Sequence, residues 1–450
     1  MVVVYHLRPS ALPGGYVGVD VFFVISGFLI SRHLLAEADR TGRVDLARFW
    51  AGRVRRILPA ALVTVVAVVA AATLLLPRTA SAEIGRTGVW SALSAANWLF
   101  AAQSVDYEAR SPDASPFQHF WSLGVEEQFY LLWPIAVLVV ALVARRSGRE
   151  VRRLVLLPFG VVLGASLLFG VWFTATGSAA AYFVTPTRMW ELAAGGLLAA
   201  LLVDRQPSPR VALIVQATGV AAIAAGAVLF DAATPMPGVA AVLPVAGAVA
   251  FIAAGDAPVL RRIWALRPVR ALGDVSYSLY LWHWPLLVIG RSVLGHEPGR
   301  VALAAIAVAS LAAAALSYRF VEQPFRRAGM GRPLRVVAIG GIATAVAVAV
   351  ALTPVGLDRA ASAREATVRA AVLEAPSGPA IGYAQFDGDA SRTWARPEHV
   401  VIPDPALATK SSPLNECTTP PEAATSPVCV RGDVDSRVTV ALVGDSHARQ

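Results

Sequence analysis

The sequence predicts an all-α bundle of membrane-spanning helices, with about ten spans and an N-terminal stub before them. Of the 450 residues, 56% are hydrophobic and 15% are charged, whereas soluble domains carry about 25% charged residues. The apolar residues form continuous runs of about 17–22, long enough to cross a hydrocarbon core of about 30 Å. These runs do not alternate, and helices are the elements that satisfy their own backbone hydrogen bonds in lipid.

Ten apolar runs are the predicted spans, and residues 1–7 are interpreted as the end of a further span. The runs cover 16–35, 58–76, 128–143, 154–173, 182–203, 211–230, 238–254, 272–293, 301–318 and 334–354. Residues 1–355 therefore form the predicted membrane domain.

Arginines set the predicted orientation. The loop after the first run holds six arginines between residues 40 and 56, and the loop after the third holds five between 145 and 153. By the positive-inside rule these loops are cytoplasmic, which explains the net charge of +9. The alternate loops hold scattered arginines, among them Arg188. The segment 88–102 would swap the sides of every later loop if it were a span, so it is interpreted as re-entrant or interfacial.

Two polar residues near the N-terminus are candidate catalytic groups, because polar groups inside spans are costly and mark functional sites. His6 ends the first apolar stub; the alternative is an interfacial histidine with a satisfied ring. Asp20 lies among Val and Phe residues and needs a partner, for which His6 or an arginine is the natural choice. A carboxylate beside a histidine would orient it as a base.

Arg53 and Arg56 are candidate donor-binding residues. They are three apart and therefore share a helix face at the predicted cytoplasmic edge. Guanidinium groups bind phosphate through paired hydrogen bonds, so a donor with a pyrophosphate, such as a coenzyme A thioester, would fit. The alternative is that both arginines only anchor the helix at the membrane edge.

Further polar residues occur in three other stretches. Glu126 and Glu127 are adjacent, so at most one of them faces a given site, and headgroup exposure is the alternative. His283 shares a helix face with Tyr277 and Tyr280, which indicates a polar lining, although a lone histidine there could belong to the core. Glu322 is expected to make ordinary surface pairs with neighbouring arginines.

No metal-ligand spacing, P-loop or dinucleotide motif is present, so we expect no metal and no tightly bound cofactor. The basic stretches lack interleaved aromatic residues, which argues against nucleic acid.

The tail after residue 355 is predicted to lie outside the membrane. Residues 356–414 have the composition of a linker. Cys417 and Cys429 would form a disulfide in an oxidising compartment, with free thiols as the alternative. The last stretch, "VALVGDSHARQ", has the pattern of a strand and a turn that present Ser446 as an exposed nucleophile.

Together the motifs resemble acyltransferase family 3, integral-membrane O-acyltransferases of cell-surface polysaccharides. The matching stretches, which occur in family order between residues 4 and 327, are "YHL", "GGYVGVDVFFVISGFLI", "FWAGRVRRILPA", "WSLGVEEQFYLLWP", "SYSLYLWHWP" and "RFVEQPFRR". The tail resembles, mainly through "VGDSH", the start of the α/β SGNH-hydrolase-like domain that one branch of this family carries; here it would be residues 415–450.

The resemblance implies a function and a location. The protein would sit in a bacterial plasma membrane, with its tail outside. It would move an acyl group, most often acetyl, from cytoplasmic acyl-CoA to a hydroxyl of a surface or cell-wall glycan.

The resemblance also implies roles for single residues. His6 would be the essential first-span histidine, a base or transient acyl acceptor, which Asp20 would tune. Arg53 and Arg56 would engage the donor. Glu127 and His283 fall in family motifs, and Ser446 falls on the SGNH nucleophile.

Two departures from the family pattern predict that the sequence is a fragment. The family has an arginine about eleven residues before the first-span histidine, and SGNH domains need an Asp-x-x-His element after the serine. Two alternatives to an enzyme remain open: a polytopic transporter or flippase, and a non-catalytic sensor with a degenerate outer domain.

Overall fold

The computed structural model describes residues 1–103, 114–202, 207–255, 265–329 and 331–374. The chain divides into two units, Met1–Gly356 and Leu357–Gln450. Cys417, Cys429 and Ser446 lie outside the described residues, so their expected roles and the SGNH-like domain stay predictions.

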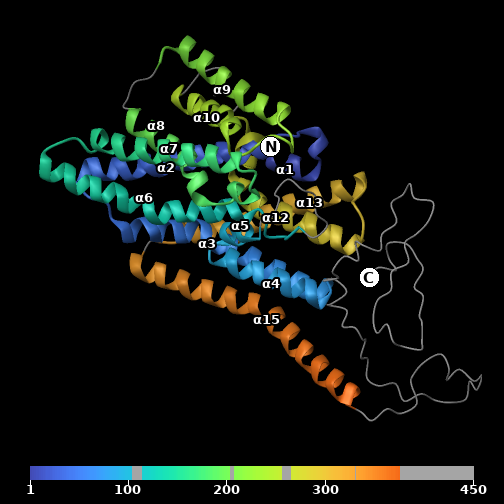
Figure 1. Ribbon diagram of the computed structural model, residues 1–450. Helices are drawn as coiled ribbons and strands as arrows, with labels where there is room; N and C mark the ends of the chain where they lie inside the picture. The colour runs from blue at the N-terminus through green and yellow to red at the C-terminus, as the bar shows by residue number, and fades with distance from the viewer. Residues whose placement is uncertain (104–113, 203–206, 256–264, 330, 375–450) are drawn as a thin grey trace, which may run out of the picture. The chain divides into compact units, whose positions relative to one another are not determined.

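The described residues form helices and contain no strand (Figure 1). The α-helices are α1 (Val2–Leu7), α2 (Gly18–Thr41), α3 (Leu46–Leu75), α4 (Arg78–Ala92), α5 (Ala96–Ala102), α6 (Phe120–Ser147), α7 (Val151–Ala175), α8 (Met189–Leu201), α9 (Pro209–Leu229), α10 (Val242–Ala253), α12 (Arg267–Leu294), α13 (Arg300–Ser317), α14 (Gln323–Arg327) and α15 (Pro333–Glu374). The prediction of an all-α membrane bundle is confirmed for this part of the chain.

The number of spans is only partly as predicted. Each predicted run falls on a helix, and seven helices of the described residues are long and apolar enough to cross a membrane. Helices α8 and α10 are apolar but short. Helix α12 has 28 residues, but polar groups such as Tyr277 and His283 lower its hydropathy. The structure thus supports a multi-pass membrane protein and does not confirm a count of ten.

The segment 88–102 does not form one continuous helix. Helix α4 ends at Ala92 and α5 begins at Ala96, and Ser94 between them has a left-handed φ of 54°. Their lengths of 15 and 7 residues are below the roughly 20 needed to span a bilayer. The break agrees with the interpretation that this segment does not cross the membrane as a single helix.

Helix α15 continues beyond the predicted end of its span. Pro354 lies inside the helix, which reaches Glu374. The described part of the predicted linker 356–414 is therefore helical.

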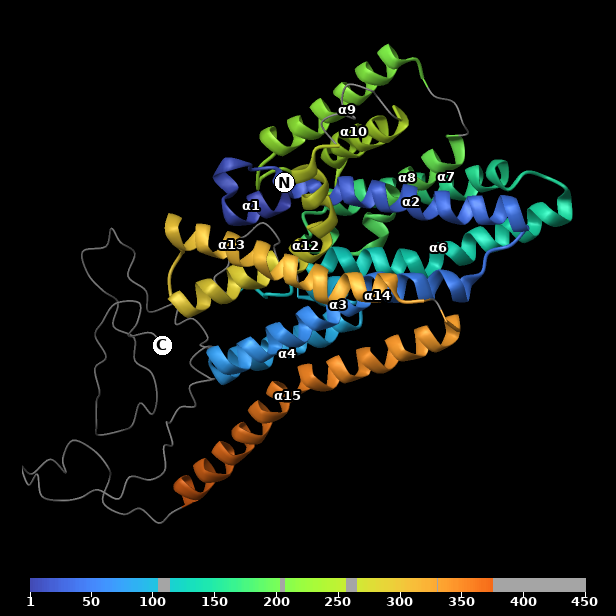
Figure 2. The ribbon, with the colours of Figure 1, turned by 180° about the vertical axis from the view of Figure 1, so that it is seen from behind.

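Helix α2 lies in the middle of the bundle, with α6 on one side and the α9–α10 pair on the other (Figures 1 and 2). Its contact with α8 is very close. A Cβ built on Gly27 would lie 1.9 Å from the carbonyl oxygen of Leu192, and one on Gly195 would lie 2.1 Å from that of Val24. Small residues allow such approach, and close packing is a main source of helix association in lipid.

We expect Gly27→Ala to lower the stability of the bundle by about 1–3 kcal/mol, because the added methyl group overpacks the α2–α8 contact. Thermal unfolding of the purified protein in detergent measures this effect. Gly52→Ala is the matched control, since a Cβ on Gly52 meets nothing within 4 Å and alanine is the better helix former. Equal melting temperatures for both variants would contradict the close contact.

Candidate active site

Three buried histidines, His6, His119 and His283, form a group that we call the histidine cluster. They come from α1, from the residue before α6, and from α12. Nδ1 of His6 lies 2.8 Å from Nε2 of His283. The ring centroids of His119 and His283 are 5.6 Å apart. The structure thus brings together two predicted site residues that are 277 positions apart and adds His119 to them.

Backbone carbonyls determine the tautomers of His283 and His6. Nδ1 of His283 lies 3.1 Å from the carbonyl oxygen of Leu279 and 2.8 Å from that of Tyr280. A carbonyl only accepts, so Nδ1 of His283 carries the proton, and Nε2 of the neutral ring is an acceptor. His6 therefore donates its Nδ1–H to His283 and carries its lone pair on Nε2. This is the arrangement that a nucleophilic or basic imidazole needs.

Both the ring and the backbone carbonyl of His119 make hydrogen bonds. Its Nε2 lies 3.2 Å from the carbonyl oxygen of Leu281, so this nitrogen donates, and Nδ1 carries the lone pair. The hydroxyl of Tyr280 donates to the His119 carbonyl oxygen at 2.8 Å. Nδ1 of His119 is buried and has no hydrogen-bond partner among the described residues. The cluster thus holds a second imidazole lone pair.

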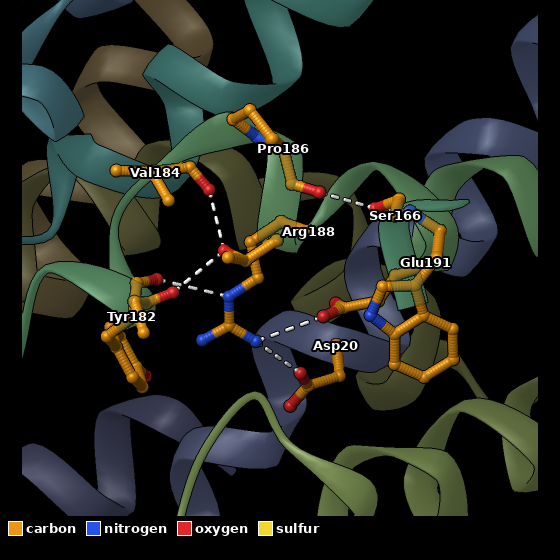
Figure 3. A network of polar contacts seen from close by, with 10 residues as sticks. Asp20, Ser166, Tyr182, Val184, Pro186, Arg188 and Glu191 are labelled. Carbon is orange, nitrogen blue, oxygen red and sulfur yellow. Dashed lines mark hydrogen bonds and ion pairs between the residues drawn. The ribbon is translucent and has the colours of Figure 1, made fainter. Parts of the chain in front are cut away.

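Asp20 pairs with an arginine and not with His6, contrary to the expectation that it tunes this histidine (Figure 3). The guanidinium Nη1 of Arg188 lies 2.8 Å from Asp20 and 3.0 Å from Glu191. Its Nε donates to the carbonyl oxygen of Tyr182 at 3.1 Å. The ring centroids of Tyr182 and Trp121 lie 4.5 and 5.1 Å from the guanidinium carbon. Asp20 is therefore part of a buried ion network that joins α2 to the start of α8.

Sequence reasoning placed Arg188 in an outer loop, whereas its side chain is only 1% exposed. The residue does lie between helices, at the N-cap of α8. A signal was present, because Asp20 within a span required a buried partner. The positions of the arginines in the sequence could not show which of them would pair with Asp20.

A cavity of about 60 Å³ lies between α3 and α6, and we call it the slot. Helices α3 and α6 run antiparallel. Trp50, near the start of α3, hydrogen bonds to the carbonyl oxygen of Tyr130 in α6. Farther along α3, Val69 lies beside Gly88, and so does Phe117, which precedes α6 in the chain. The lining residues are Arg53, Val54, Ile57, Leu58, Ala61, Leu62, Val65, Ser91, Ala92, Ser94, Phe120, Leu123 and Glu127.

The slot has polar groups at one end and apolar side chains along its length. Arg53 is level with Glu127 and Tyr130, and its guanidinium carbon lies 5.8 Å from the Tyr130 ring centroid. Nε of Arg53 and Oε1 of Glu127 are buried without a hydrogen-bond partner among the described residues. Along α6, eight positions (127 − 119) separate Glu127 from His119, which is about 12 Å at 1.5 Å per residue. The slot therefore leads from a charged end toward the level of the histidine cluster.

The two carboxylates of α6 point to different places, as expected for neighbours on a helix. Glu126 accepts hydrogen bonds from the hydroxyls of Ser26, at 2.7 Å, and of Tyr130. Glu127 lines the slot, and Glu126 is not among its lining residues.

Three of the four arginines of α3, Arg53, Arg55 and Arg56, also have different surroundings. Arg53 lines the slot, Arg56 is exposed and does not line it, and Arg55 donates to the carbonyl oxygen of Phe325. Arg53 and Arg56 therefore have different surroundings, and their role in binding the donor stays a prediction. At 100° per residue, Arg56 lies about 60° around the helix from Arg53, on the side away from the rest of the slot lining.

Glu322 is not a surface residue, contrary to expectation. It is 3% exposed and lies in a π-helical turn, Tyr318–Glu322. It accepts from Arg326 at 3.1 Å and from the hydroxyl of Ser278 at 3.1 Å. The predicted pair with an arginine is present, and the bond to Ser278 fixes the turn after α13 against α12.

The helical membrane bundle and these motifs can be compared with known families. Residues 1–319 match the model of a family described as an acyltransferase domain. The match covers more than half of the chain, so the protein belongs to acyltransferase family 3, as its motifs predicted.

Two relatives are similar to most of the chain. The chain is 32% identical over 340 residues to the O-acetyltransferase OatA of Staphylococcus aureus (strain NCTC 8325 / PS 47), covering 73% of this chain and 55% of that protein. It is 32% identical over 344 residues to the peptidoglycan O-acetyltransferase OatA of Listeria monocytogenes serovar 1/2a (strain ATCC BAA-679 / EGD-e), covering 73% and 54%. The chain thus spans about half the length of these relatives. No solved structure matches it.

We expect Arg188→Leu to destabilise the protein by about 3–5 kcal/mol, because it leaves Asp20 and Glu191 as unpaired buried carboxylates. Thermal unfolding in detergent is the measurement. Arg86→Gln is the control, since the Arg86–Glu83 pair is about half exposed and such pairs contribute about 0–1 kcal/mol. A melting temperature of Arg188→Leu equal to that of the control would show that the network does not hold α2 and α8 together.

Proposed function

We propose that the protein is a bacterial plasma-membrane O-acyltransferase that moves an acetyl group from cytoplasmic acyl-CoA to a hydroxyl of a cell-wall glycan outside. The observation that carries this proposal is the slot, which leads from Arg53 and Glu127 toward the level of the histidine cluster. Family membership and the two relatives named as O-acetyltransferases support the reaction class. The name of the Listeria relative supports peptidoglycan as the acceptor.

The length of the donor fits the distance from the polar end of the slot to the cluster. About thirteen bonds separate the phosphorus of a phosphopantetheine arm from its sulfur. An extended chain advances about 3.5 Å for every three bonds, so the arm reaches about 15 Å. The rise from Glu127 to His119 is about 12 Å. A donor whose phosphates stay at the exposed Arg56 and whose arm enters the slot beside Arg53 would therefore bring its thioester toward the histidines.

The tautomers suggest how the acyl group transfers. Nε2 of His6 attacks the thioester carbonyl, the carbon–sulfur bond breaks, and the thiolate leaves. The Nδ1 proton of His6 passes to Nε2 of His283, whose Nδ1–H stays bonded to backbone carbonyls, so the acylated His6 ring is neutral. An acceptor hydroxyl then attacks the acyl carbon, His283 returns its proton to His6, and the hydroxyl proton ends on the thiolate.

The acceptor is either the glycan itself or a side chain of an outer domain. Ser446 is the candidate for this intermediate acceptor in the proposed SGNH-like domain. The predicted number of spans and the arginine-rich loops support a tail on the outer side. A transporter with the same fold would move its substrate with the thioester intact. Cleavage of the thioester therefore distinguishes an acyltransferase from a transporter.

We expect labelled acetyl-CoA, supplied to inverted membrane vesicles containing the protein, to yield label on the glycan or on the protein. His6→Ala should reduce this transfer by at least about a hundredfold, in the range typical for loss of an acid–base group. Scintillation counting of washed vesicles measures it.

The control for the His6 variant is His33→Ala, because His33 is exposed on α2. Wild-type transfer by a folded His6→Ala variant would refute the role of His6. Uptake of intact acetyl-CoA without transfer would favour the transporter.

His283 should respond differently to two amide substitutions. Glutamine places an acceptor near the position of Nε2 and keeps the contact with His6, whereas asparagine reaches only the position of Nδ1. We expect His283→Gln to retain several-fold more acetyl transfer than His283→Asn, because an oriented base depends on its hydrogen-bond partner. The same vesicle assay measures both, with expression and melting temperature as checks on folding. Equal losses in the two variants would contradict this orienting effect and would show that transfer needs a ring able to take up the proton of His6.

A further inference from the structure

The polar end of the slot has two unsatisfied hydrogen-bonding atoms of opposite kind. Nε of Arg53 is a donor, and Oε1 of Glu127 is an acceptor; both are buried without a partner among the described residues. Both residues line the same cavity, yet the structure records no ion pair between them within the described residues. Buried polar groups are normally paired. The two residues come from α3 and α6, on different walls of the slot, so a ligand with an acceptor on one side and a donor on the other would satisfy both.

Burial at the polar end of the slot favours a neutral ligand group. Nε of Arg53 and Oε1 of Glu127 are both buried, and most of the side chains that line the slot are apolar. Moving an additional charge from water into such a place costs far more than moving a neutral dipolar group that pairs with both atoms.

We infer that the polar end of the slot binds a secondary amide, with its C=O accepting from Nε of Arg53 and its N–H donating to Glu127. This inference rests on the proposed function, because the donor's pantetheine arm carries two such amides. An N-acetylated sugar acceptor carries the same chemistry, so the test must separate these two sources.

The dimensions of the slot favour the pantetheine arm. Apolar side chains from α3 and α6, such as Ile57, Leu62 and Leu123, line the slot beyond Arg53, which suits an extended chain better than a sugar ring. From the nitrogen of the amide farther from the sulfur, about eight bonds lead to the acyl carbon, or about 10 Å. The rise from Glu127 to His119 is about 12 Å. The amide farther from the sulfur is therefore the one that we assign to Arg53 and Glu127.

The phosphates of the donor belong to a different place. Arg56 is exposed and outside the slot lining, about 60° around α3 from Arg53. It binds phosphate without bringing negative charge next to the carboxylates. The two arginines of the Arg-x-x-Arg pair thus have different tasks: Arg56 binds charge, and Arg53 binds the neutral arm.

Binding of three probes to the purified full chain in detergent tests this inference. The probes are pantetheine, which has no phosphate, coenzyme A and N-acetylglucosamine, and isothermal titration calorimetry gives their affinities. We expect Glu127→Ala to weaken pantetheine and coenzyme A by the same factor, about tenfold. We expect Arg56→Gln to weaken coenzyme A at least about tenfold and to leave pantetheine unchanged. Glu127→Gln keeps an acceptor oxygen and should lie between wild type and Glu127→Ala.

Glu83→Gln is the matched control, since Glu83 is exposed and makes only a surface pair. Three results would overturn the inference: no binding of pantetheine, no effect of Glu127→Ala on a folded protein, or binding of N-acetylglucosamine that Glu127→Ala removes. The last result would assign the amide to the acceptor. Acetyl transfer in vesicles is measured separately, so its persistence would leave the proposed function intact while the amide site fails.

Discussion

The hydrocarbon core offers no water to a polar group, and this constraint explains most of the polar structure of the bundle. A buried group must find its partner inside the protein. Asp20 finds Arg188, Glu126 finds Ser26 and Tyr130, and His283 finds two backbone carbonyls and His6. These partners come from different helices, so each satisfied group also fixes how two helices lie against each other.

The same constraint makes the exceptions informative. Nε of Arg53, Oε1 of Glu127 and Nδ1 of His119 are buried without partners among the described residues. All three belong to the slot or to the histidine cluster. A polar atom left without a partner carries a cost of about 1–3 kcal/mol, and a ligand that pairs with it removes this cost. Other buried atoms without a partner, such as Oε1 of Gln216, lie elsewhere in the described residues, so these three support the proposed substrate path through their shared location.

The sequence was sufficient for those features that depend on one helix at a time. Run length predicted the helices, the cost of a carboxylate in lipid predicted that Asp20 needs a partner, and the helical period predicted that Glu126 and Glu127 diverge. Features that depend on two helices were not predictable. Which face of α3 lines the slot, and therefore that Arg53 lines it and Arg56 does not, follows from packing against α6. The burial of Arg188 likewise depends on Asp20 and on the ring of Trp121, which lie far away in the chain.

The histidine cluster also has a consequence for biogenesis. His6 lies in the first helix and His283 in α12, so their hydrogen bond joins residues 277 positions apart. During synthesis the first histidine emerges long before its partner, and no shorter nascent chain contains both. The tautomer of His6 is thus defined only after nearly the whole acyltransferase domain has been inserted. A half-inserted chain would hold His6 without His283, so in the proposed mechanism acyl transfer waits until the domain is assembled.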